Sequence, residues 1–182
     1  MGRPRARLSL KGRALQLLAQ RDQSRVELRG KLLRHAAAEA RARATADAEA
    51  DTEASTRLVA EREGTDDDPD DTTRRHEAVE ALLDWLEANR YLSSERFAES
   101  RVHAREARFG NRRIRAELAQ HGVALSPDAA AALAASELQR AAAVRARRFK
   151  ALPQDASERA AQARFLAGRG FSPDVIQRVL RR

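Results

Sequence analysis

The sequence predicts an all-α protein made of three tandem three-helix repeats, with a long acidic, low-complexity insertion in the first repeat. Two observations support the helices: apolar residues recur at helical spacing, and no segment alternates apolar and polar residues with a period of two. A third observation supports the repeats. The tripeptide Ser-Pro-Asp occurs at Ser126 and again at Ser172, each time a few residues after a glycine. The segments around the two tripeptides begin about 43 residues apart, which is typical of a helical repeat.

The first repeat is predicted over residues 1–90. Its helices are expected near residues 8–20, 24–35 and 76–90. Ser24 and Glu27 have the spacing of a capping box at the start of the second helix. The third helix carries one apolar stripe at i, i+3, i+4 and i+7, formed by Val79, Leu82, Leu83 and Leu86.

The insertion is predicted over about residues 37–75, between the second and third helices. Residues 39–71 contain 12 acidic and 4 basic side chains. Its first half is rich in alanine and is compatible with partial helix. Its second half has high charge and almost nothing to bury, so we expect a disordered or frayed segment.

The second repeat is predicted over residues 91–136 and the third over 137–182. Each is expected to begin with a longer, Arg-rich helix, at about 94–108 and 137–151. The Ser-Pro-Asp tripeptides mark helix starts within these repeats. Serine is a good N-cap, proline suits the first helical position, and aspartate in the first turn is stabilised by the helix dipole. Gly122, before the first tripeptide, is predicted to end a helix in a left-handed conformation.

The charge distribution favours a polyanionic partner. The chain has a net charge of +8, and outside residues 39–71 it holds 31 basic and 15 acidic side chains. A body this basic is typical of proteins that bind nucleic acid, a nucleoprotein or an acidic protein surface. A genome rich in G and C would also raise the arginine and alanine content, so composition alone leaves both explanations open.

Rows of basic residues on the predicted helices are the candidate binding surface. Ten residues form them: Arg101, Arg105, Arg108, Arg112, Arg113, Arg115, Arg145, Arg147, Arg148 and Lys150. Such rows can follow phosphates or an acidic groove. The alternative is a solvated face with local ion pairs, for instance Arg101 near Glu106 and Arg113 with Glu117. Aromatic residues do not interleave with these arginines, which disfavours a base-stacking binder of single strands.

The sequence marks no catalytic residue, cofactor site or metal site, and we expect a protein that is not an enzyme. There is no phosphate-binding loop, no HExxH motif and no cysteine. The four histidines are scattered along the chain. No stretch approaches the roughly 20 apolar residues of a membrane span, and the N-terminal segment does not have the pattern of a signal peptide. A cytoplasmic protein without a membrane partner is therefore expected.

Three segments of the chain, taken together, resemble the RecX family, regulators of the bacterial RecA recombinase. They are ALQLLAQRDQSRVELRGKL near the front, YLSSERFAESRV followed by GNRRIRAEL in the middle, and FLAGRGFSPDVIQRVL at the end. Each segment is a helix-packing pattern, and their order and spacing make the resemblance specific. The chain departs from the family in two places: Ser93-Ser94 stands where acidic residues are usual, and the acidic insertion interrupts the first repeat.

The resemblance implies an elongated, curved, all-helical array that lies in the groove of the RecA–DNA filament. Such proteins inhibit ATP hydrolysis and strand exchange and favour loss of the filament. The implied partners are the RecA filament and, weakly and without sequence preference, DNA; we expect a monomer. Two alternatives remain open from the residues themselves. One is a helix-turn-helix-like regulator that acts directly on DNA, and the other is a helical scaffold whose acidic insertion binds a basic partner.

Overall fold

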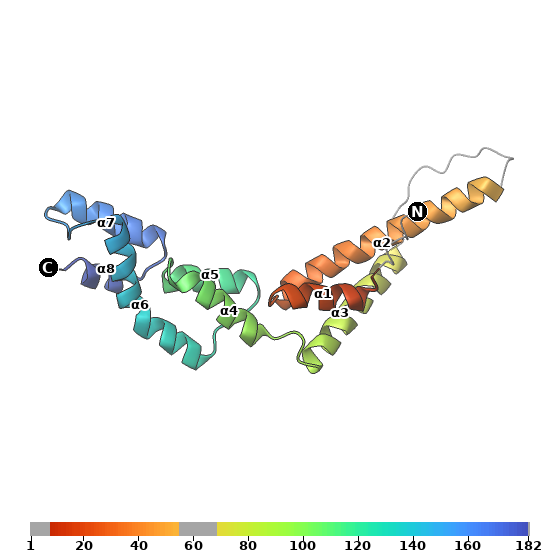
Figure 1. The fold of residues 1–182 in the computed structure, drawn as a ribbon, viewed down its shortest axis with the longest axis horizontal. Helices are drawn as coiled ribbons and strands as arrows, with labels where there is room; N and C mark the ends of the chain where they lie inside the picture. Colours follow the sequence, from red (N-terminus) through yellow and green to blue (C-terminus); the bar gives the residue numbers. More distant parts are fainter. Residues whose placement is uncertain (1–7, 55–68, 182) are drawn as a thin grey trace. The chain divides into compact units, whose positions relative to one another are not determined.

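The computed structural model describes residues 8–54 and 69–181, with the backbone alone described for 47–54 (Figure 1). These residues form eight helices and no strand, so the predicted all-α class is confirmed. The helices are α1 (Leu10–Gln20), α2 (Arg25–Ala54), α3 (Pro69–Ala88), α4 (Ser94–Glu106), α5 (Asn111–Gln120), α6 (Pro127–Arg148), α7 (Ala156–Gly168) and α8 (Pro173–Val179). They belong to two compact units, residues 1–92 and 93–182.

Helices α1, α2 and α3 enclose the core of the first unit. Its buried members are Ala14, Leu17, Leu28, Leu32, Val79, Leu83, Leu86 and Leu92. The apolar stripe predicted on α3 supplies three of them. Arg25 adds a polar clamp between helices, because its guanidinium lies 2.7 Å from a carboxylate oxygen of Glu80 and 2.8 Å from one of Asp84 and one of Glu87. The N-terminal end of α2 is thereby fixed to one face of α3.

The connection between α1 and α2 is held by buried polar groups. The amide of Glu27 donates to the Ser24 hydroxyl at 3.1 Å, as the predicted capping box requires. Gln23 is 2% exposed, donates to the Leu17 carbonyl and accepts from the Lys31 ammonium. The Glu27 carboxylate binds Lys31 and Arg21. Burial raises the pKa of Glu27, but hydrogen bonds from these two cations outweigh it and lower the pKa to about 2.

Helix α2 is much longer than the sequence predicted. It continues to Ala54, so residues 37–54, the alanine-rich first half of the expected insertion, are helical, as their composition allowed. Helix α3 begins at Pro69, so the expectation of a disordered or frayed segment is wrong over 69–75. Alanine has the highest helix propensity, and it recurs through this part of the sequence. Local propensity therefore extends the helix beyond the residues that pack in the core. Residues 55–68 of the expected insertion lie outside the described residues.

The second unit has two apolar cores, and α6 contributes to both. The first contains Phe97, Ala98, Ile114, Leu118, Val123 and Leu133; the second contains Ala141, Val144, Leu166, Phe171, Val175, Ile176, Val179 and Leu180. The sequence predicted that one helix begins at Ser126 and another spans 137–151. The structure joins them into one helix, Pro127–Arg148. No glycine or proline interrupts this stretch, so the backbone continues from one core to the next.

The two Ser-Pro-Asp tripeptides both begin helices, but their serines act differently. The Ser126 hydroxyl accepts from the amide of Ala129 at 3.3 Å, as an N-cap does. Ser172 occupies the N-cap position of α8 but makes no side-chain cap bond to that helix. Its hydroxyl donates instead to Glu137 on α6, at 3.1 Å. The prediction of a helix start is confirmed at both sites, and the prediction of a capping hydroxyl is wrong at Ser172.

Candidate basic interface

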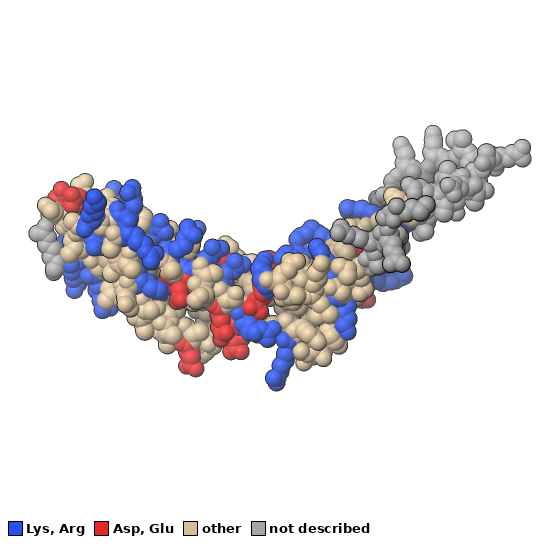
Figure 2. Space-filling view, in the orientation of Figure 1, with Lys and Arg blue, Asp and Glu red and all other residues tan. Residues whose placement is uncertain are grey.

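The basic residues of the second unit greatly outnumber its acidic ones. Residues 93–182 hold 18 Lys and Arg against nine Asp and Glu, a net charge of +9. Figure 2 shows basic side chains gathered along α5, α6 and α7. The ten predicted binding residues all lie in this unit, and the structure divides them by what their charged groups contact.

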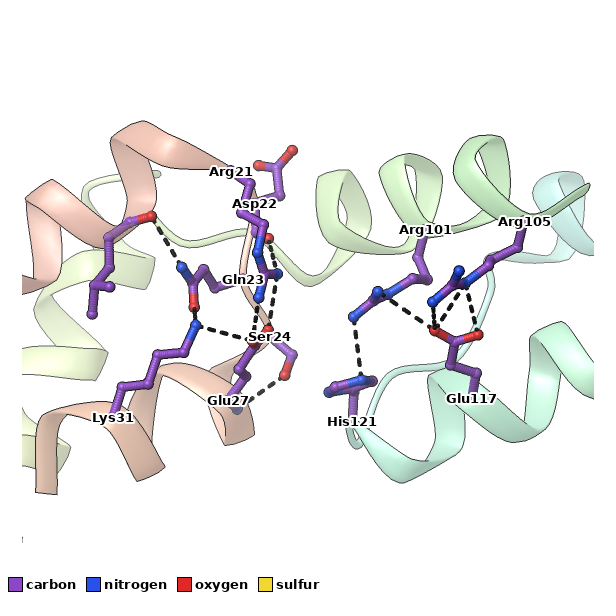
Figure 3. A network of polar contacts seen from close by, with 11 residues as sticks. Arg21, Asp22, Gln23, Ser24, Glu27, Lys31, Arg101, Arg105, Glu117 and His121 are labelled. Atoms are coloured by element: carbon purple, nitrogen blue, oxygen red, sulfur yellow. Dashed lines mark hydrogen bonds and ion pairs between the residues drawn. The ribbon is translucent and has the colours of Figure 1, made fainter. Parts of the chain in front are cut away.

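Two of the ten, Arg101 and Arg105, share the Glu117 carboxylate as their ion-pair partner (Figure 3). The Arg105 guanidinium meets both carboxylate oxygens at 3.1–3.2 Å, which is a bidentate pair. Arg101 lies 3.4 Å from the same carboxylate and 5.2 Å from the centre of the Phe97 ring. The sequence had instead suggested that Arg101 lies near Glu106 and that Glu117 pairs with Arg113. These two arginines therefore fasten α4 to α5.

A close contact between two glycine backbones positions several of the other arginines. The Gly110 amide donates to the Arg169 carbonyl at 2.9 Å, and the Arg112 amide donates to the Gly170 carbonyl at 3.0 Å. A Cβ atom on Gly110 would lie 2.3 Å from the Gly170 carbonyl oxygen, so a side chain does not fit there. Gly170 has φ of +83°, a conformation that glycine adopts readily. The start of α5 thus packs directly on the end of α7.

Glu137 and Arg140 of α6 form hydrogen bonds that stabilise this joint. The buried Glu137 carboxylate accepts from the amides of Asn111 and Ser172, at 3.0 and 3.3 Å, as well as from the Ser172 hydroxyl. Arg140 donates to the carbonyl oxygens of Phe109 and Leu133 and to the Asn111 side chain. Desolvation by burial lowers the pKa of Arg140, but an arginine stays protonated in this setting. These two charged residues thereby provide hydrogen-bond partners for backbone groups after the end of α4 and at the starts of α5 and α8.

Five arginines from four segments meet around this joint, and we call them the basic cluster: Arg108, Arg112, Arg113, Arg147 and Arg169. Arg169 donates to the Arg108 carbonyl at 3.3 Å, and Arg147 donates to the Ala107 carbonyl at 3.1 Å. None of the five has an ion-pair partner among the described residues. Three of the guanidiniums, those of Arg113, Arg147 and Arg169, donate to backbone carbonyls, which orient them without neutralising them. The cluster can therefore bind phosphate or carboxylate groups.

The remaining predicted residues lie apart from the basic cluster. Arg145, Arg148 and Lys150 are at the end of α6, where Arg145 donates to the Ala151 carbonyl at 2.9 Å. Arg148 and Lys150 line a 320 Å³ pocket together with Gln162. Arg115 is exposed on α5. The structure thus brings four of the ten predicted residues into one cluster and leaves six elsewhere.

Sequence reasoning did not include Arg169 among the binding residues. It lies in a turn after α7, about 60 positions from Arg108, and no helix periodicity connects the two. The signal that was available is the Gly-Arg-Gly sequence at 168–170, because a close approach of backbones at a glycine also brings the neighbouring side chain to the joint. The fold also stacks Arg113 over Phe109, with the guanidinium carbon 4.4 Å from the ring centre. That ring is therefore covered by a cation.

The described residues contain no group of three or more His, Asp or Glu side chains placed to hold a metal ion. None of the described helices combines the length and apolar character that a membrane span requires.

Comparison with known proteins identifies the family. Residues 95–133 match the family model of the second three-helix domain of RecX, and residues 135–180 match that of the third. A regulatory protein RecX from Herbaspirillum seropedicae is 43% identical over 176 residues, covering 96% of this chain and 90% of the relative. The chain belongs to the RecX family. Another RecX, from Ralstonia nicotianae, is 41% identical over 182 residues and covers 99% of this chain and 91% of the relative.

A solved structure supports the RecX fold. The crystal structure of RecX from Lactobacillus salivarius aligns with a TM-score of 0.55 at 16% identity, covering 94% of this chain and 92% of that one. The two RecX domain matches meet between residues 133 and 135, inside α6. The third helix of one RecX domain and the first helix of the next are therefore a single helix in this protein. The basic cluster lies where these two domains join.

Proposed function

We propose that this protein regulates the RecA recombinase by binding in the groove of the RecA–DNA filament. Binding there would reduce ATP hydrolysis, strand exchange and the persistence of the filament. Membership of the RecX family supports the target. The observation that carries the proposal is the basic cluster, whose five arginines lack carboxylate partners among the described residues. A filament of protein and DNA presents the phosphates and carboxylates that such guanidiniums bind.

The joint between the two RecX domains gives the cluster a physical role. Its arginines come from α5, α6 and the turns that follow α4 and α7, so their spacing depends on the Gly110–Gly170 contact and on the Glu137 network. A rigid set of guanidiniums loses less conformational freedom on binding than a set on flexible loops. We infer that the cluster binds as a unit, by position and charge, with no bond-making chemistry of its own.

The test is a titration of RecA with the purified protein, following DNA-dependent ATP hydrolysis and strand exchange. The variant Arg112→Gln/Arg113→Gln/Arg147→Gln removes three charges from the cluster. We expect it to require at least about tenfold more protein for half-inhibition, since each charge-assisted bond contributes roughly 1.5–3 kcal/mol before losses.

The matched control removes the same three charges from exposed positions on α2, with Arg34→Gln/Arg41→Gln/Arg43→Gln. We expect this control to inhibit nearly as well as the unmodified protein. Equal inhibition by both variants would contradict the role of the cluster. Unchanged ATP hydrolysis and strand exchange with the unmodified protein would contradict the proposed function itself.

Direct, sequence-specific action on DNA is the less favoured alternative. A helix-turn-helix reading would place α5 and α6 as the two helices and α6 in the major groove. The first three turns of α6 carry no arginine, lysine or asparagine, and Glu137 and Leu133 are buried. Base readout needs such donors at the N-terminal end of the recognition helix. We expect DNA binding to be independent of sequence and to weaken steeply with salt, and a preferred duplex sequence would favour the alternative.

A further inference from the structure

A groove between α4 and α6 has the opposite charge to the rest of its unit. It has a volume of about 440 Å³ and lies outside the basic cluster. Helix α4 lines it over three turns, from Glu95 to Glu106, and α6 lines it from Ser126 to Ser136. Since an α-helix rises about 1.5 Å per residue, the α4 wall is roughly 17 Å long. This length matches about three turns of a bound helix.

The floor of the groove is apolar, and one of its walls is made of small side chains. Ala98 and Leu133 are buried there, and Val102 and Leu125 are partly buried against the same core. On the α6 side the wall is formed by alanines, including Ala132, which is exposed. Small residues at a helical wall leave room for larger apolar side chains of a partner. Such a floor suits the apolar face of an amphipathic helix.

The rim of the groove is acidic. Three of the nine acidic residues in 93–182 line it, Glu95, Glu99 and Glu106, and its lining contains no lysine or arginine. The same segment of the chain holds 18 basic residues. Figure 2 shows the acidic side chains gathered where α4 meets the beginning of α6. His103 is the other titratable residue in the lining, and its ring lies 3.8 Å from Glu106.

We propose that this groove binds an amphipathic helix of a protein partner, one with leucine-like residues on one face and lysine or arginine beside them. The apolar floor buries the leucine-like residues, and the glutamates pair with the lysines or arginines. The rim repels phosphates, so nucleic acid is not the occupant. This site is separate from the basic cluster, and the proposal does not depend on the filament function.

The test uses the full chain and two synthetic helical peptides of about five turns, enough to be helical when bound. Both carry the same leucine face; the polar face is lysine in one and glutamate in the other. Fluorescence anisotropy gives the two affinities. The protein's net charge of +8 favours the glutamate peptide. We nevertheless expect the lysine peptide to bind at least about tenfold more tightly, because the local rim decides charge complementarity. Equal or weaker binding of the lysine peptide would overturn the proposal.

Two variants place the binding in the groove. Glu95→Gln/Glu99→Gln removes exposed charges without touching the core and should weaken the lysine peptide by about tenfold. Ala132→Trp fills the groove and should abolish binding of that peptide. The control Glu77→Gln/Asp174→Asn removes the same charge from exposed positions elsewhere and should bind as the unmodified protein does. The proposal is wrong if the Glu95/Glu99 variant binds the lysine peptide as tightly as this control.

Discussion

Gly110 and Gly170 show how two residues without side chains decide the geometry of the second unit. The backbones touch, and two hydrogen bonds cross between the start of α5 and the end of α7. The space for a Cβ atom on Gly110 is occupied by the Gly170 carbonyl. The obstructing atoms belong to the backbone, so they cannot move aside as the end of a flexible side chain could. The contact therefore depends on glycine at this position.

Replacing Gly110 with alanine should destabilise the second unit by more than about 2 kcal/mol, since the added methyl group forces the backbones apart. Urea unfolding followed by circular dichroism measures the change. Gly168→Ala is the matched control, because a Cβ atom there meets nothing within 4 Å. Helix propensity predicts that this control gains up to about 1 kcal/mol. If both alanine variants unfold alike, the close contact does not contribute to stability.

Glu27 should make stability depend on pH in the acid range. Its pKa in the folded state is about 2, below the unfolded value of roughly 4.3. A lowered pKa contributes stability that is fully present above the unfolded value and is lost as the pH falls toward 2. Glu27→Gln should therefore cost about 1–2 kcal/mol at pH 7 and progressively less below pH 4.3.

Urea unfolding of both proteins at pH 7 and pH 3 checks the Glu27 prediction. Glu77→Gln, at an exposed position of α3, is the control and should show little effect at either pH. A Glu27→Gln cost that stays constant between the two pH values would show that the ion pairs with Arg21 and Lys31 do not stabilise the fold.

At the scale of elements, α6 determines the organisation of the second unit. Leu133 belongs to one core, and Ala141 and Val144 belong to the other. Glu137 lies between the two cores and binds the amides of Asn111 and Ser172, each at the start of another helix. A carboxylate at a helix N-terminus is stabilised by the helix dipole as well as by its hydrogen bonds. One buried side chain thus joins α5, α6 and α8.

Glu137→Ala should cost about 2–4 kcal/mol, because it leaves buried donors on Asn111 and Ser172 without an acceptor. Gln139→Ala, at an exposed position of the same helix, controls for the change in helix propensity. Urea unfolding gives the free energies, and proteolysis between residues 149 and 155 reports loosening of α7 and α8. A Glu137→Ala protein as stable as the control would contradict the role of this network.

At the scale of the whole molecule, the acidic stretch is separate from the residues that form the cores. Among the described residues, the core of the first unit draws on positions up to Leu33 and from Val79 onward. Residues 39–71 carry the 12 acidic side chains. The described core residues and the acidic stretch therefore occupy different parts of the chain.

Replacing residues 39–71 with a short Gly/Ser linker should leave the first unit folded, with a loss of melting temperature below about 5 °C, since no core residue is removed. Inhibition of RecA should also persist. Thermal unfolding and the ATP hydrolysis titration measure the two effects. Loss of inhibition by a variant that still folds would instead support the scaffold alternative, in which the acidic stretch binds a basic partner.

The sequence predicted the helices better than it predicted their ends. Periodicity located the apolar stripe of α3 and the capping by Ser24 and Ser126, because these depend on residues within one turn of each other. It placed the end of α2 too early, since a helix beyond the core is held by propensity alone. It also split α6 in two, because the repeat spacing placed a boundary after residue 136, although no glycine or proline interrupts the stretch.

By itself the sequence determined the all-α class, the capped helix starts at Ser24 and Ser126, the excess of positive charge and the resemblance to RecX, since each depends on residue type and short spacing. Tertiary structure decided which arginines are available. Arg101 and Arg105 are paired with Glu117, whereas Arg113 and Arg169 meet at a joint formed by residues far apart in the chain. It also decided that the Ser172 hydroxyl donates to Glu137 and does not cap its own helix. Charge availability depends on distances between helices, and local sequence patterns do not contain those distances.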